Sequence, residues 1–139
     1  MNRAPRVVAR DLAEAEAVLA AAAELGVPVI LMSPPDAGAT HGAAYFRELW
    51  AAAAEARPAA DFEGILDCGG AAGYAMAALA EGIARLRLDA PDDVLDRVRD
   101  MAAKSGARLD ESNDAALEFS TSTDAALRDW LRGERSLAP

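Results

Sequence analysis

The sequence predicts a three-layer α/β domain in which about five mostly parallel strands carry helices on both faces. Short apolar runs alternate with helical patterns along the chain, and this alternation is typical of βαβ units. The chain has 139 residues, a length that suits one domain without a disulfide or a metal to stabilise it. We therefore expect one domain over residues 1–139, with a frayed tail over 134–139 and a flavodoxin-like or sequentially wound strand order.

The first βα unit has a signal at each end of its helix. A strand is expected over residues 6–10. The helix begins after Asp11, because Glu14 three residues later completes a capping box, and it ends at Gly26. Residues 27–32 are continuously apolar, which predicts a strand covered on both faces.

The middle of the chain predicts two helices around another strand. A helix over residues 43–57 has an apolar stripe that we expect in the core: Phe46, Leu49, Trp50, Ala53 and Ala54. A strand over 64–68 precedes a helix over 71–81 that is apolar nearly all round. Such a helix must be covered on more than one side, by neighbouring helices or by a second subunit. We favour self-association, most simply as a twofold dimer.

The last third predicts alternating short strands and helices. Residues 85–89 alternate charged and apolar side chains, which indicates a strand at or near a sheet edge. A helix starts at Pro91 and ends at Gly106, and short strands are expected over 108–111 and 117–120. The residues we expect to point inward from this helix and from the last one, which begins near Thr123, are Val94, Val98, Met101, Ala102, Leu127, Trp130 and Leu131.

Charge and hydropathy restrict the partners that the chain can have. It carries 23 acidic and 14 basic residues, a net charge of −9, which opposes binding to nucleic acid or to anionic lipid. The longest apolar stretch, residues 18–32, is interrupted by Glu24 and Pro28 and falls short of the ~20 residues that span a bilayer. The start of the sequence has no apolar leader, and Cys68 is the only cysteine, so we expect a cytoplasmic protein.

The candidate site lies in the loops that follow the second and third strands. In an open parallel sheet, ligands bind outside the carboxyl ends of the strands. The loop after the second strand contains Ser33, Asp36 and His41, and the loop after the third strand runs from Asp67 to Gly73. We expect these two loops to converge on one ligand.

Gly69, Gly70 and Gly73 are candidate ligand-binding residues. A glycine-rich turn lets backbone N–H groups approach a ligand, and the following helix adds a partial positive charge, so the turn is suited to a small anion. The turn matches the dinucleotide fingerprint only in part: it keeps two of the three glycines and lacks the first. Asp89 lies at the sequence distance expected of an acid that binds a ribose hydroxyl. The alternative is that the glycines permit a tight turn and close packing of helix on strand.

The stretch from Asp67 to Gly73 also resembles the first motif of S-adenosylmethionine-dependent methyltransferases, with Ala71 where that family has glycine. The resemblance implies that Asp89 is the ribose-binding acid. It also implies that Ser33 begins a loop similar to the family's catalytic Ser/Asn/Asp-Pro-Pro loop, although Asp36 replaces the usual aromatic residue. Such a methyltransferase has more strands than the chain after Asp89 can supply.

Three residues are candidates for catalysis. Asp67 is either a general base or ligand anchor, or a cap that accepts backbone N–H bonds. Cys68 and His41 could act as nucleophile and base if they meet, since a basic neighbour makes a thiol reactive. The alternatives are a buried small hydrophobe for Cys68 and a solvated loop residue for His41. The spacing of His, Cys and acidic residues predicts no metal site.

These observations predict a self-associating binding or regulatory module for a small, anionic ligand at the two loops. A small enzyme acting on a nucleotide-like or phosphorylated substrate, including one that binds S-adenosylmethionine, is the alternative. A third interpretation is an assembly subunit in which the glycines serve packing only. The sequence names no cofactor and does not decide whether the chain is an enzyme.

Overall fold

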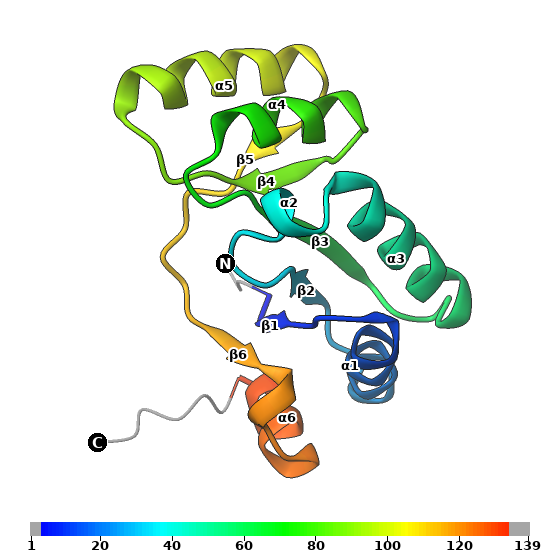
Figure 1. The fold of residues 1–139 in the computed structure, drawn as a ribbon. Coiled ribbons are helices and arrows are strands. Elements are labelled where there is room, and N and C mark those ends of the chain that lie inside the picture. The colour runs from blue at the N-terminus through cyan, green and yellow to red at the C-terminus, as the bar shows by residue number, and fades with distance from the viewer. Residues whose placement is uncertain (1–3, 134–139) are drawn as a thin grey trace. The chain divides into compact units, whose positions relative to one another are not determined.

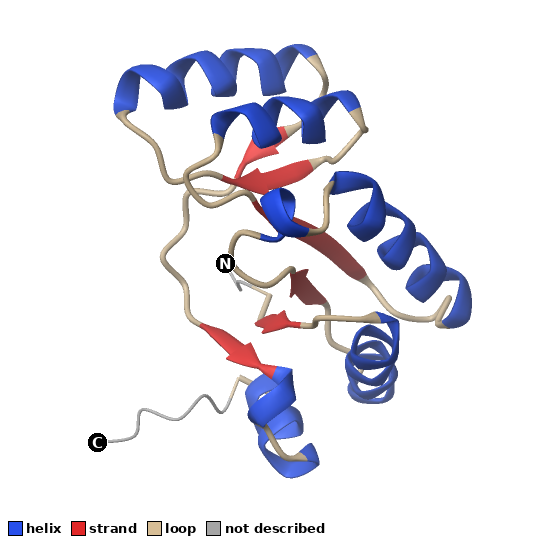
Figure 2. Ribbon diagram, in the orientation of Figure 1, coloured by secondary structure: helices blue, strands red, loops and turns tan. Residues whose placement is uncertain are grey.

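The protein, described over residues 4–133 by a computed structural model, is built on parallel strands that alternate with helices (Figures 1 and 2). The strands follow the order β5-β4-β3-β2-β1-β6, so the sequentially wound alternative is confirmed, with β6 added beside β1. Their bounds are β1 Arg6–Val8, β2 Val29–Met32, β3 Phe62–Asp67, β4 Arg85–Arg87, β5 Arg108–Leu109 and β6 Ala116–Glu118. The predicted frayed tail over 134–139 lies outside the described residues.

The contacts divide the chain into two compact units. The first comprises the described residues up to Met32, Trp50–Glu63 and the described residues from Asp114 onward. The second comprises Ser33–Leu49 and Gly64–Asn113. The single domain expected from the chain length stays a prediction, and each unit is described by itself below.

The first unit packs β1 between β2 and β6, with helices α1 (Leu12–Leu25) and α6 (Asp124–Leu131) in contact. The capping box of α1 is confirmed: the Asp11 carboxylate accepts the Glu14 N–H at 2.9 Å, and Gly26 ends the helix in the left-handed region at φ 68°. The indole Nε1–H of Trp130 donates to the Arg6 carbonyl at 2.9 Å, so α6 is fixed to the backbone of β1.

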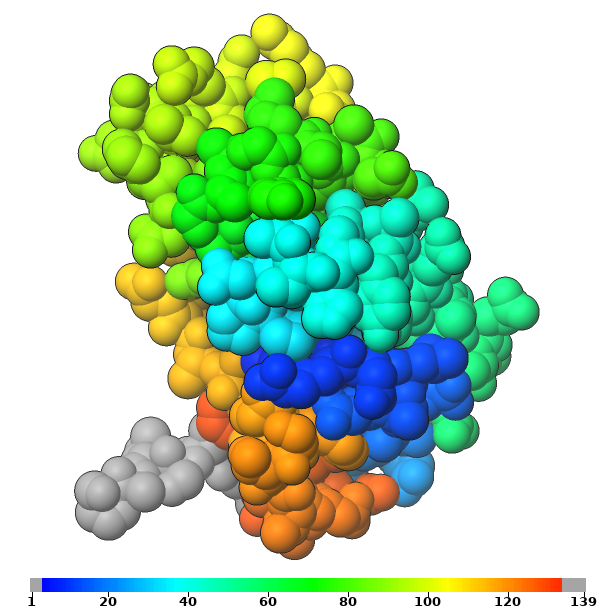
Figure 3. Space-filling view, viewed as in Figure 1, coloured from blue at the N-terminus to red at the C-terminus, as the bar shows by residue number. Residues whose placement is uncertain are grey.

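The second unit places β4 between β3 and β5, so β4 lies one strand from an edge, as its alternating pattern predicts. Helices α4 (Ala72–Ala80) and α5 (Asp92–Lys104) pack side by side, and α5 contacts β5 (Figure 1). A short helix, α2 (Ala37–Thr40), follows β2 and contacts α4, and the two are adjacent on the face drawn in Figure 3. Helix α2 lies in the segment that the sequence predicts as a loop.

Two residues expected in the core are exposed. Helix α3 (Ala43–Ala56) buries Phe46, Leu49 and Ala53, and Ala54 is turned too far round the helix from these positions to reach the core. The inward face of α5 includes Val98 and Ala102, and Met101 lies on its flank with 43% of its surface exposed. Both differences have one cause: Ala54 and Met101 lie at the margin of an apolar helical stripe, where a side chain is turned partly toward solvent.

Helix α4 is apolar but is not covered all round. Ala75, Ala78 and Leu79 are buried, whereas Tyr74 is 49% exposed and Ala77 is also exposed. Packing within the chain therefore covers one side of α4, and self-association through the exposed side stays a prediction. Among residues 4–133, no helix is both long and apolar enough to cross a membrane.

Candidate ligand-binding cavity

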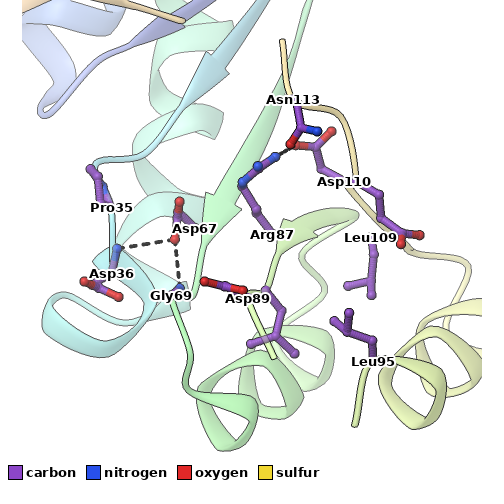
Figure 4. Close-up of a pocket in the computed structure, with 12 residues that line it drawn as sticks. Pro35, Asp36, Asp67, Gly69, Arg87, Asp89, Leu95, Leu109, Asp110 and Asn113 are labelled. Atoms are coloured by element: carbon purple, nitrogen blue, oxygen red, sulfur yellow. Dashed lines mark hydrogen bonds and ion pairs between the residues drawn. The ribbon is translucent and has the colours of Figure 1, made fainter. Parts of the chain in front are cut away.

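A cavity of about 520 Å³ lies within the second unit at the carboxyl ends of β3, β4 and β5 (Figure 4). It is where the rule for open parallel sheets places a ligand. The lining from the loops after β2 and β3 is Pro35, Asp36, Asp67 and Gly69. The lining from β4, α5, β5 and the segments that follow β4 and β5 is Arg87, Leu88, Asp89, Leu95, Leu109, Asp110, Glu111 and Asn113.

Asp67 holds the two predicted loops together. Its Oδ1 accepts the Gly69 N–H at 2.8 Å and, at 3.4 Å, the Asp36 N–H (Figure 4). The Asp67 N–H in turn donates to Ser33 Oγ at 2.8 Å. Asp67 does not cap α4, whose N-cap residue is Ala71, so its backbone partners lie in the loops themselves. The loops after β2 and β3 do converge, and Asp67 is the residue that joins them.

Gly69 is the one glycine of the predicted turn whose position requires glycine. Its φ is +58°, and a Cβ there would overlap the Asp36 carboxylate. At Gly70 a Cβ would be 3.4 Å from the Asp89 carbonyl oxygen, and at Gly73 it would enter open space. The glycine at 73 is therefore not needed for close packing of helix on strand. Asp36 itself is left-handed, at φ 60°, so two left-handed residues face each other at the cavity.

Cys68 and His41 do not line the cavity. The Cys68 side chain is fully buried, and burial, with a smaller effect from the Asp67 charge, raises the pKa of its thiol to about 11. His41 is exposed before α3, where its Nδ1 is 3.1 Å from Thr40 Oγ1 and its ring stacks on Tyr45 with 5.2 Å between centroids. This geometry does not support a nucleophile and base pair, because a buried, protonated thiol is a poor nucleophile.

Ser33 and Asp89 have different environments. Ser33 is 2% exposed; its hydroxyl donates to the Pro34 carbonyl and accepts the Asp67 N–H. Its side chain therefore stabilises the loop and does not face the cavity. Asp89 is exposed and lines the cavity, and its backbone N–H donates to the Gly69 carbonyl at 2.7 Å. Within residues 4–133, the Asp89 carboxylate has neither a hydrogen-bond donor nor an ion-pair partner.

On the β4–β5 side of the cavity, sequence reasoning named Asp89 but missed Arg87 and Asp110. The Asp110 carboxylate is fully buried between two guanidinium groups, with Arg87 Nη1 at 2.8 Å and Arg85 Nη2 at 3.2 Å. Arg87 Nη1 also donates to the Ser112 carbonyl at 2.6 Å. The sequence signal for this ion cluster is the pair of arginines that alternate along β4, together with the acid that directly follows β5.

Two leucines and an ion-paired glutamate form much of the remaining wall of the cavity. Leu95 of α5 and Leu109 of β5 face each other in Figure 4. Glu111 is bound by Arg99 at 2.6 Å, and this hydrogen bond lowers the pKa of the Glu111 carboxyl. In the described part of the chain, no group of three or more His, Cys, Asp or Glu side chains is arranged to hold a metal ion.

Comparison with protein-family models gives no match, and no curated protein matches the sequence at a significant level. The assignment of the cavity therefore depends on its geometry and chemistry alone.

Proposed function

We propose that the chain is a binding module whose second unit takes a small ligand with a positively charged group in the cavity at the carboxyl ends of β3 to β5. The supporting observation is the Asp89 carboxylate, which lines a cavity of about 520 Å³ and has no partner in residues 4–133. Small-molecule sites are cavities of roughly 300–1,000 Å³ with a few polar groups that fix the ligand.

The charges favour a cation over the anionic ligand suggested by the glycine-rich turn. Asp36 and Asp89 both line the cavity, and neither side chain has a cationic partner in the described chain. Arg87 is the cationic side chain in the lining, and part of it is engaged by Asp110. An anion would meet uncompensated carboxylates, whereas an ammonium group would form charge-assisted hydrogen bonds with them.

A binding role has more support than an enzymatic one. Catalysis by Cys68 and His41 would need both at the cavity, and neither lines it. Asp67 does line it, but its Oδ1 accepts two backbone N–H groups, so one of its two carboxylate oxygens is used to hold the loops together. The positions of Cys68, His41 and Asp67 therefore favour neither a small enzyme nor a subunit whose glycines serve packing only.

The proposal is tested by the melting temperature of the protein in the presence of n-hexylamine. Because a ligand that prefers the native state stabilises it, the wild-type melting temperature should rise by several degrees at saturating amine. Asp89→Asn should abolish most of the rise. Asp93→Asn, which removes an equal charge at an exposed position outside the lining, should retain it. No rise in the wild type, or equal losses in both variants, would contradict the proposal.

A further inference from the structure

We propose that the ligand of this cavity is a zwitterion whose ammonium group binds at Asp89 and whose carboxylate binds at Arg87. This inference rests on the proposed function and adds the second recognition point and the chemical class. It follows from the opposite charges that line different parts of the cavity.

The positive end of the cavity is Arg87. Arg87 Nη1 and Arg85 Nη2 both bind the buried carboxylate of Asp110. Arg87 lines the cavity and 32% of its side chain is exposed, whereas Arg85 is absent from the lining. Of the two guanidinium groups, that of Arg87 is therefore the one that a ligand in the cavity can reach.

The Arg87 guanidinium is held in one orientation with donors to spare. Its Nη1 donates to the buried Asp110 carboxylate at 2.8 Å and to the Ser112 carbonyl at 2.6 Å. Within residues 4–133, no hydrogen bond engages its Nε or Nη2. A guanidinium has five N–H donors in a planar fork that matches a carboxylate, and a fork already fixed by other bonds loses little entropy on binding.

The negative end is set apart from Arg87. Figure 4 shows Arg87 directed toward Asp110 and Asn113, while Asp89 lies beside Gly69 on the side of Asp67. A ligand that reaches both ends must carry its charges several bonds apart. This favours an ω-amino acid over an α-amino acid, in which the two charged groups are neighbours.

The apolar lining suits the part of the ligand between its charges. Leu95 and Leu109 lie next to the charged groups in the same cavity. A methylene chain would bury its surface against them, which is favourable by the hydrophobic effect. The three features together describe a linear zwitterion with an apolar middle.

The test compares three probes of equal chain length by isothermal titration calorimetry: ε-aminocaproate, n-hexylamine and caproate. Because a hydrogen-bonded charge contributes to affinity, ε-aminocaproate should bind the wild type at least about tenfold more tightly than either singly charged probe. Arg87→Gln should remove this preference and leave n-hexylamine binding in place.

Arg85→Gln is the matched control, because it removes the same charge from Asp110 without changing the lining. Any loss due to stability or to net charge should occur in both variants, so the additional loss in Arg87→Gln reports direct contact. Equal binding of ε-aminocaproate and n-hexylamine, or equal losses in the two folded variants, would overturn the zwitterion and leave the proposed function standing. Failure of all three probes with the wild type would overturn both.

Discussion

Asp67 acts through its backbone partners, since one carboxylate oxygen holds the N–H groups of Asp36 and Gly69. The acid and the glycine after an apolar strand were identifiable from the sequence as site residues. The role of Asp67 was not, because Ser33 and Asp36 lie in a different loop and only the folded chain brings them to Asp67. At the residue scale, sequence reasoning therefore finds positions more readily than it finds their partners.

Gly69→Ala should destabilise the protein by about 2 kcal/mol or more, because alanine is strained at φ +58° and its Cβ would overlap the Asp36 carboxylate. Gly73→Ala is the matched control. It places a methyl group in open space on helix α4 and should stabilise by about 0.5–1 kcal/mol. Urea denaturation measures both. A Gly69→Ala protein as stable as the wild type would show that the left-handed turn is not required.

Cys68 should be unreactive in the native protein, because its thiol is buried and its pKa is raised to about 11. Labelling with a thiol-specific disulfide reagent near neutral pH should be slow in the folded state and fast in denaturant. Since the folded pKa lies above the ordinary value of 9.0, the thiol favours folding below that pH, and its contribution is lost as the pH rises toward about 11. Rapid labelling of the folded protein would contradict this account.

At the scale of elements, strong local signals predicted helices better than they predicted strands. The capping box and Gly26 located both ends of α1, because caps are local interactions. β4 and β5 are shorter than expected, and the register that pairs Leu86 with Leu109 could not be read from either strand alone. That register places Asp110 against the two arginines of β4, so the ion cluster escaped prediction.

Asp110→Asn should destabilise the protein by about 3 kcal/mol, because it leaves two guanidinium groups without their shared, fully buried carboxylate. Glu111→Gln provides a neighbouring control. Glu111 also forms an ion pair, but 53% of its side chain is exposed, so its loss should change stability little. The measurement is the free energy of unfolding in urea. Similar values for the two variants would mean that burial does not distinguish these ion pairs.

At the scale of the whole molecule, the sequence predicted the parallel α/β class and the edge of the sheet at which the cavity lies. Both follow from general rules: alternating strand and helix patterns predict a parallel sheet, and sites lie at the carboxyl ends of its strands. The strand order stayed open between two alternatives, because local patterns do not determine which strands pair. The charge that the cavity favours in a ligand could not be predicted from the sequence, since it depends on which carboxylates find partners in the folded chain.

We expect the cavity bounded by Asp36, Asp89 and Arg87 to bind a ligand with a positive group. Backbone amide chemical shifts of labelled protein, followed by NMR during titration with n-hexylamine, test it most directly. We expect saturable shifts concentrated at the loops around Asp36, Gly69 and Asp89, and their loss in Asp89→Asn. Saturable shifts confined to other parts of the chain, or no shifts at all, would contradict it.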